Sequence, residues 1–258
     1  MKYIKIAQLL FGLRHKGGRN STGKITAPRR GALTKQLYRF IDTKRRIWSK
    51  DGATILSPYI YDPNRSSYIT LIMFPNGVMT YIQAGNYSTG QQKIYNLSLM
   101  DIYDPNSSQI LKKIKNGSFI SNCELHIYKG AQMLRSAGVS GLLLNKALNN
   151  SAIIKLKSGA IRKVSSQITT AIGVSSNANH FLINYKKAGR SRLNGQRPRS
   201  RPSAMNPVDH PMGGRTKGGI HPQSKTGILI GSPTANNKKW HNLEILSARK
   251  RRLKKKNG

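Results

Sequence analysis

Acidic side chains are scarce in this sequence. Its 258 residues include 8 Asp and Glu against 45 Lys and Arg, which gives a formal net charge of +37. A compact domain with that charge repels itself strongly, so we expect the folded state to need a polyanion. The imbalance argues against an ordinary cytosolic enzyme and against a secreted binding module.

Cysteine is nearly absent as well. Cys123 stands alone, which excludes an internal disulfide framework and a zinc cluster built on several thiolates. Cys123 and His126 form a C-x-x-H pair, but a structural zinc site needs four ligands and no second pair stands nearby. We therefore expect a buried thiol on a strand rather than a metal site.

Long apolar runs are also missing. No stretch of about 18 apolar residues occurs, so neither a membrane span nor a membrane partner is expected. Residues 6–13 form a short apolar run, but no small-residue cleavage site follows it and the next residues are basic, so we do not expect a signal peptide.

The excess charge sits at the two ends of the chain. Basic and acidic residues number 14 and 2 in residues 1–60, 2 and 3 in 61–110, 10 and 1 in 111–185, and 19 and 2 in 186–258. This distribution predicts a folded middle between two basic extensions.

The middle of the chain has the pattern of β-structure. Residues 55–61, 68–74 and 78–83 are apolar, aromatic or β-branched runs, and the turn signals 62–65 and 75–77 separate them. Three runs joined by short turns predict an antiparallel meander. Short strands without helical patterns favour a small barrel, because closure removes exposed edges.

A second β-unit follows a connector at 87–116, which has short strands of its own at most. Its candidate strands are 122–127, 141–145, 153–157, 160–164, 168–174 and 181–185. Ser158 and Gly159 mark a hairpin between the third and fourth of these. These runs predict a second small barrel.

The composition changes at Lys186. Six of the 11 prolines and nine of the 24 glycines fall in residues 186–258, where large aliphatic residues are few. Such a segment buries too little surface to offset its ordering entropy, so it is either disordered or ordered only against a partner. The run 249–256 is almost wholly basic, and the first 30 residues have a similar character.

Structured RNA is the polyanion that suits this distribution best. Lys and Arg release counterions when they neutralise phosphates, and Gly allows close approach of the backbone. Packed RNA helices form crevices that an extended Gly-, Arg- and Pro-rich segment can thread, whereas no helix-turn-helix, zinc finger or basic zipper is visible. The alternative is a free-standing, histone-like nucleic-acid-binding protein, which would show no preference for one RNA.

Two arginines leave alternatives open. Arg65 is the only basic residue in 51–92 and ends a tight turn, where it contacts a phosphate or sugar, or pairs locally with Asp62. Arg135 lies in 132–138, a stretch that predicts one helical turn with a solvated arginine.

Two further motifs suggest chemistry. His210 is a candidate general base, but no nucleophile with a partnered base is evident, so a hydrogen bond to RNA or backbone in a Pro-flanked turn is favoured. Residues 18–25 resemble a phosphate-binding loop, but Ile25 follows Lys24 where that loop needs Ser or Thr. Nucleotide hydrolysis is therefore not expected.

Seven short sequence motifs follow one another along the chain in an order that is recognisable. They are residues 18–20, 23–26, 38–42, 61–66, 134–138, 187–192 and 204–211. With these strings the chain resembles the family of the universal large-subunit ribosomal protein number two, from about Gly17 to about Ser224. The last string, AMNPVDHP, is the most specific. The chain departs from the family at Met212, where a second histidine is usual.

The resemblance implies an all-β fold, with an OB-like barrel followed by an SH3-like barrel and long basic irregular extensions at both ends. The expected segments are an N-terminal extension (1–30), the OB-like barrel (31–95), a connector (96–117), the SH3-like barrel (118–185) and a C-terminal extension (186–258).

The resemblance also implies a function. A structural constituent of the large ribosomal subunit is expected, which binds large-subunit rRNA near the peptidyl-transferase centre and supports subunit association and translation. Its partners would be rRNA, neighbouring ribosomal proteins and the small subunit. It would not be an enzyme, because RNA carries peptidyl transfer, and it would need no cofactor besides magnesium ions associated with the rRNA.

The compartment is predicted from composition. The chain is rich in Asn, Ile, Lys and Tyr and begins without an Arg- and Ser-rich presequence, which favours a mitochondrial ribosome and synthesis inside the organelle. A plastid or bacterial ribosome is the alternative.

The expected rRNA contacts follow from the strings and the extensions. The resemblance assigns RNA contact to Arg65 and Arg135, which reverses the preference for a local ion pair at Arg65. The full set is Arg19, Asn20, Lys24, Arg29, Arg30, Arg39, Arg65, Arg135, Arg190, Arg192, Arg197, Arg199, Arg201, Asn206, His210 and His221.

Overall fold

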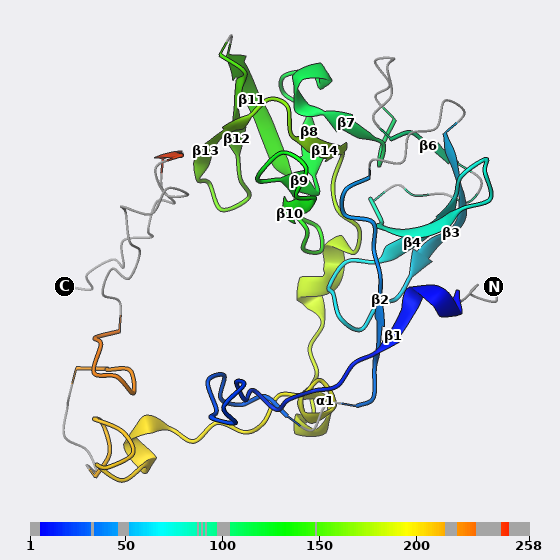
Figure 1. The fold of residues 1–258 in the computed structure, drawn as a ribbon. Coiled ribbons are helices and arrows are strands. Elements are labelled where there is room, and N and C mark those ends of the chain that lie inside the picture. Colours follow the sequence, from blue (N-terminus) through cyan, green and yellow to red (C-terminus); the bar gives the residue numbers. More distant parts are fainter. Residues whose placement is uncertain are drawn as a thin grey trace. The chain divides into compact units, whose positions relative to one another are not determined.

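The computed structural model places the chain in two compact units (Figure 1). It describes residues 6–31, 34–45, 52–86, 88, 90, 92–96, 104–147, 149–214, 221–230 and 244–247. Unit 1 comprises residues 1–13, 36–183 and 240–258, and unit 2 comprises 14–35 and 184–239. Strands make up most of the regular structure, and the described residues contain a single short α-helix, which confirms the all-β fold class.

The first sheet of unit 1 contains four antiparallel strands in the order β5-β4-β3-β6. They are β3 (Ala53–Ile60), β4 (Ile69–Met73), β5 (Met79–Gln83) and β6 (Lys93–Ile94). The predicted meander is therefore confirmed. Tyr81 on β5 also bridges Ile41 in parallel, which extends the sheet at its β5 edge.

The second sheet of unit 1 has seven strands in the order β15-β13-β12-β11-β8-β14-β7. They are β7 (Ser108–Ile110), β8 (Phe119–Ser121), β11 (Gly141–Ala147), β12 (Ser151–Lys155), β13 (Ile161–Ser165), β14 (Thr169–Ile172) and β15 (Ile245–Ser247). The predicted hairpin at Ser158 and Gly159 joins β12 to β13. The edge strand β15 comes from near the C-terminus, and Glu244 beside it pairs with Arg162 at 2.9 Å.

Each sheet buries its own apolar side chains, because alternate residues of a strand face the same side. The first sheet has two adjoining clusters, Ala53, Ile55, Ile72, Phe74, Ile82 and Ile94, and Ile60, Ile69, Leu71 and Tyr81. The second buries Leu111, Ile114, Ile120, Cys123, Leu143, Ala152, Ile154, Val164 and Ile168. Full burial of one such aliphatic side chain contributes about 1.5–3 kcal/mol. The expected buried thiol of Cys123 is confirmed, on strand β9 (Cys123–Glu124).

Polar contacts connect the two sheets within unit 1. Ser66 accepts from Ala137 N–H through Oγ (3.1 Å) and from Asn177 Nδ2 through its carbonyl (2.6 Å). The amide of Tyr68 donates to Ser176 Oγ at 3.1 Å. These bonds join the turn after β3 to loops of the second sheet, and this junction carries the site described below.

Two local predictions were wrong. Residues 181–185 do not form a strand; a 3₁₀ turn, η3 (Ala178–Leu182), begins there after Asn177 in the left-handed region, and Phe181 is 81% exposed. The apolar run has no sheet neighbour among the described residues. The stretch around Arg135 is not helical, because β10 (Ala131–Met133) pairs with β9 and the chain then bends.

One ladder was not predicted. Strand β1 (Leu10–Gly12) pairs antiparallel with β2 (Leu37–Arg39). β1 lies in the short apolar run 6–13 and β2 lies in charged sequence, and neither shows the alternation that predicts a strand.

Unit 2 is held together by backbone pairing between its two segments. Gly31 N–H donates to the Gly195 carbonyl (3.0 Å), and Arg197 N–H donates to the Arg29 carbonyl (2.9 Å). Its single helix is α1 (Ala188–Leu193), and the described part of unit 2 contains no buried cluster of apolar side chains. The basic run 249–256 lies outside the described residues. Among the residues that are described, no helix is long and apolar enough to cross a membrane.

Candidate nucleic-acid interface

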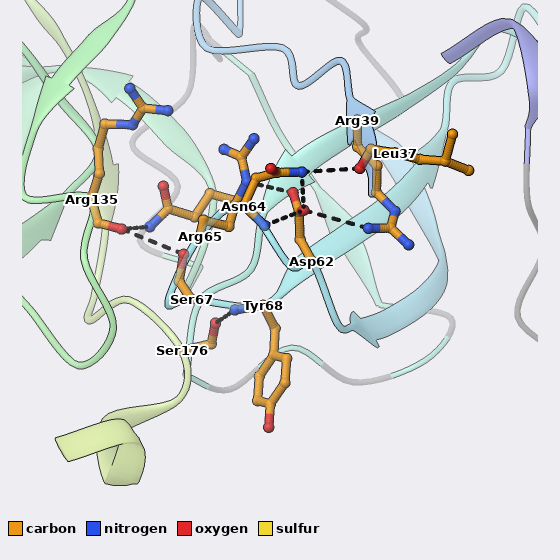
Figure 2. A network of polar contacts seen from close by, with 10 residues as sticks. Leu37, Arg39, Asp62, Asn64, Arg65, Ser67, Tyr68, Arg135 and Ser176 are labelled. Atoms are coloured by element: carbon orange, nitrogen blue, oxygen red, sulfur yellow. Dashed lines mark hydrogen bonds and ion pairs between the residues drawn. The ribbon is translucent and has the colours of Figure 1, made fainter. Parts of the chain in front are cut away.

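An open cavity of about 470 Å³ lies in unit 1 where the turn after β3 faces the segment after β10. It is lined by Tyr38, Asn64, Arg65, Ser66, Ser67, Gln83, Arg135 and Ser136. We call this cavity the arginine pocket. Figure 2 shows its polar network, with Arg65 between Asp62 and Arg135 in this view.

Arg65 is held from two sides. Its Nε donates to Asp62 Oδ2 at 2.6 Å, and its guanidinium carbon lies 5.9 Å from the centroid of the Tyr38 ring. The local ion pair considered from the sequence is therefore present. It engages Nε alone among the described contacts, so the N–H donors on the two Nη atoms remain for a ligand.

Arg135 reaches the same pocket from the segment that follows β10. Its carbonyl accepts from Gln83 Nε2 and from Ser67 Oγ, which fixes the backbone of its segment. Burial lowers the pKa of Arg135, and the positive charge of Arg65 lowers it further. The two guanidinium groups therefore repel each other, and an anion placed between them relieves that repulsion.

Asp62 is the centre of the network. Its side chain is fully buried, and Oδ1 accepts from Asn64 N–H at 3.0 Å and from Arg39 Nη1 at 3.4 Å. The side-chain amide of Asn64 donates to the Leu37 carbonyl at 2.9 Å, which ties the turn to β2. An Asp followed by Pro and Asn forms such a turn because the carboxylate bonds the backbone two residues on. The sequence named Arg39 and Arg65 as separate contacts, and the structure joins them through one carboxylate.

Unit 2 carries a dense positive charge around two further cavities. Within its residue ranges the sequence has 19 Lys and Arg and one acid, Asp209. The larger cavity, of about 1120 Å³, brings together four of the predicted contacts, Arg29, Arg199, Asn206 and His210. The other, of about 620 Å³, brings together Arg19, Arg29 and Arg30.

His210 sits in a closed turn. Its amide and that of Asp209 donate to the Asn206 carbonyl, and its own carbonyl accepts from Gly213 N–H at 2.9 Å. A Cβ on Gly213 would lie 2.4 Å from the Asn206 oxygen, so the turn requires glycine there. The residue is 7% exposed, and Nδ1 of its ring accepts from Met212 N–H at 3.1 Å.

The hydrogen bond from Met212 N–H to Nδ1 determines which tautomer the neutral imidazole of His210 adopts. Because Nδ1 of His210 accepts a backbone N–H, the neutral ring carries its proton on Nε2. Nε2 then donates a hydrogen bond and has no lone pair with which to accept a proton. The geometry thus favours the hydrogen-bonding interpretation of His210 over the general-base interpretation.

The loop that resembled a nucleotide-binding motif is a small hairpin. Arg19 bridges Ile25, and Asn20 Oδ1 accepts from Thr22 Oγ1 (2.8 Å) and from Lys24 N–H (2.9 Å). No helix follows it in residues 26–31, so the phosphate-binding arrangement of an NTPase is absent from this described segment.

The remaining predicted residues are spread over unit 2 and do not converge with the groups above. Arg190 and Arg192 lie on α1, and Arg197, Arg201 and His221 lie in irregular, exposed segments. Their placement leaves their roles as predictions.

Sequence reasoning named Asp62 only as a local ion-pair partner of Arg65, and it missed Gln83, which bonds the carbonyl of Arg135. Gln83 gave no signal, because its partner lies 52 residues away. Across the described residues, no group of three or more His, Cys, Asp and Glu could hold a metal ion.

Comparison with known proteins agrees with this picture. Residues 6–96 match the family described as Ribosomal Proteins L2, RNA binding N-terminal domain, and residues 105–227 match Ribosomal Proteins L2, C-terminal domain. The two matches are consistent with an OB-like barrel followed by an SH3-like barrel.

Curated relatives cover almost the whole chain. Large ribosomal subunit protein uL2 of Maricaulis maris is 40% identical over 248 residues, which is 95% of this chain and 88% of that protein. The protein of the same name from Christiangramia forsetii is 42% identical over 253 residues, 96% of this chain and 88% of that one. The chain therefore belongs to the ribosomal protein L2 family.

Proposed function

We propose that this chain is a structural constituent of the large ribosomal subunit and binds large-subunit rRNA. Membership of the L2 family supports the ribosomal role, and the match of residues 6–96 to an RNA-binding domain supports the ligand. The free-standing, histone-like alternative is disfavoured, because relatives of the full chain bear the name of a ribosomal protein.

The arginine pocket is the observation that carries the proposal. Two guanidinium groups, Arg65 and Arg135, face one cavity from different sheets, and Asp62 neutralises only part of their charge. A phosphodiester supplies the missing negative charge and accepts from the Nη donors of both side chains. Arg39, which pairs with the same carboxylate at 3.4 Å, adds positive charge beside Asp62.

Unit 2 supplies the second half of the interface. Its backbone is extended and lacks an apolar core in the described residues, and its cavities are lined by arginines. Such a segment suits a crevice between RNA helices, where each neutralised phosphate releases counterions. The remaining predicted contacts, Arg190 and His221 among them, would act along this segment.

The finer parts of the proposal rest on the family resemblance. They are proximity to the peptidyl-transferase centre, support of subunit association, contact with the small subunit and neighbouring proteins, and magnesium ions associated with the rRNA. A non-enzymatic role agrees with the Nε2–H tautomer of His210. Composition supports a mitochondrial ribosome, with a plastid or bacterial ribosome as the alternative.

A competition experiment tests the proposal. The full chain is bound to labelled large-subunit rRNA and challenged with equal phosphate concentrations of unlabelled rRNA or random duplex DNA. We expect the rRNA to compete at least about a hundredfold better, because specific binding exceeds non-specific binding by large factors. Sedimentation with large subunits after a high-salt wash provides the second readout. Equal competition by duplex DNA, without particle association, would favour the histone-like protein instead.

A further inference from the structure

We infer that Asp62 is a positioning residue of the RNA interface: a buried acid that strengthens binding of a polyanion by fixing the arginines that touch it. The inference rests on the proposed function of the arginine pocket. It assigns a role to a carboxylate whose charge alone would oppose that function.

The contacts of Asp62 are directional. Its Oδ2 accepts a hydrogen bond from Arg65 Nε at 2.6 Å. Its Oδ1 accepts from the backbone N–H of Asn64 and from Arg39 Nη1. An Arg bound through Nε alone still has the four N–H donors of its two Nη atoms, because Nε carries only one of the five donors of the guanidinium. No described hydrogen bond joins an Nη atom of Arg65 to Asp62 (Figure 2), and Arg65 is part of the pocket lining, so these donors remain for a ligand.

The surroundings make the arrangement rigid before RNA arrives. The Asp62 side chain is fully buried, and the Tyr38 ring lies against the Arg65 guanidinium on another side. The turn that carries both residues is anchored to β2 by the bond from Asn64 Nδ2 to the Leu37 carbonyl. Ordering a long side chain on binding lowers an affinity by about twofold to tenfold, and this arrangement removes that loss for Arg65.

The loss of charge and the loss of positioning predict opposite changes in RNA affinity for the substitution Asp62→Asn. Asp62→Asn removes one negative charge at an anion site, so Coulomb attraction alone predicts tighter binding of every nucleic acid. Loss of positioning predicts weaker binding of the cognate RNA, because the neutral amide holds Arg65 less firmly than a carboxylate does. Random duplex DNA, which does not use the pocket geometry, would bind as before or more tightly.

The experiment compares four full-length chains and one control for rRNA binding at a single salt concentration. The chains are the parent, Asp62→Asn, Arg65→Met and the double variant. Asp104→Asn is the matched control, because it makes the same charge change on an exposed side chain of unit 1. Thermal unfolding of each chain is recorded alongside.

We expect Asp62→Asn to weaken rRNA binding about threefold to tenfold, within the range set by side-chain ordering, while Asp104→Asn leaves it unchanged or slightly tighter. In the Arg65→Met background, Asp62→Asn should cause no further loss, since the arginine it positions is gone. A loss in that background as large as in the parent would mean general unfolding and would overturn the inference.

The outcomes separate the two claims. If Arg65→Met weakens rRNA binding but Asp62→Asn tightens it or leaves it unchanged, the pocket stands and the positioning role of Asp62 is refuted. If Arg65→Met has no effect on rRNA binding, the proposed role of the arginine pocket itself fails.

Discussion

Removal of the pocket arginines should lower both the affinity for rRNA and its salt dependence. The variants are Arg65→Met, Arg135→Met and the double variant, because methionine keeps an unbranched apolar stem without the charge. Each guanidinium that neutralises a phosphate contributes about 0.7 to 0.9 to the slope of log K against log salt. Each single variant should therefore lower that slope by about this amount.

The magnitude of the affinity loss follows from the contacts in the pocket. A hydrogen bond to a charged group contributes about 1.5–3 kcal/mol, so each single variant should bind about tenfold to a hundredfold more weakly. The two guanidinium groups share one cavity, and the positive charge of Arg65 adds to the lowering of the Arg135 pKa that burial causes. Their losses should therefore be non-additive, with the double variant losing less than the sum by at least about 0.5 kcal/mol.

Filter binding of the full chain to labelled rRNA across a salt series measures both quantities. Lys155→Met serves as the control, because Lys155 is exposed on β12, outside the residues that line the pocket. Additive losses would contradict a shared phosphate site. An unchanged slope in both single variants, or a change no larger than that of Lys155→Met, would refute the reasoning altogether.

Three further predictions concern the framework of the site. Burial raises the pKa of the Cys123 thiol, and the neighbouring carboxylate of Glu124 raises it further. A thiol reagent at mildly alkaline pH should therefore label Cys123 only after denaturation, and labelling of the folded chain would contradict this. Burial lowers the pKa of Arg45 to about 10, so the side chain stays charged at neutral pH, and it donates to Asn96 Oδ1 and to the Asn106 carbonyl. Arg45→Met should therefore lower the free energy of unfolding by about 1–3 kcal/mol. An unchanged midpoint of urea unfolding would be the contrary result. Gly213→Ala places a Cβ against the Asn206 oxygen and should open the turn to proteolysis, whereas Gly189→Ala, which meets open space, should not; equal protease sensitivity of the two variants would argue against the turn as described.

The β-structure of unit 1 could be predicted because its sequence carries local signals. Apolar runs punctuated by Pro, Asn and Gly marked β3, β4 and β5, and Ser158 with Gly159 marked the hairpin of β12 and β13. Both signals act over a few residues, so no knowledge of the rest of the chain is needed to interpret them.

The errors share one cause, which is that pairing partners are distant in sequence. Strands β1 and β2 are stabilised by pairing with each other, and neither has a sequence pattern that predicts a strand. Residues 181–185 have the composition of a strand but have no ladder partner in the described structure. Arg135 was expected on a helical turn because the pairing of β10 with β9 cannot be deduced from seven residues.

The candidate site, too, could be predicted only in part from the sequence. Arg65 and Arg135 were named from motifs, but their meeting in one cavity required the fold. The role of Asp62 required geometry, because a nearby acid is indistinguishable in sequence from a simple ion-pair partner. The structure shows that the 2.6 Å contact is made through Nε, so the Nη donors of this pocket-lining arginine remain for a ligand.

A density map of the large ribosomal subunit that contains this chain tests the central claim most directly. We expect an RNA phosphate in the arginine pocket, with oxygens within about 3.2 Å of Nη atoms of both Arg65 and Arg135. A pocket that faces solvent or protein, with the nearest phosphate beyond hydrogen-bonding reach of both side chains, would contradict it.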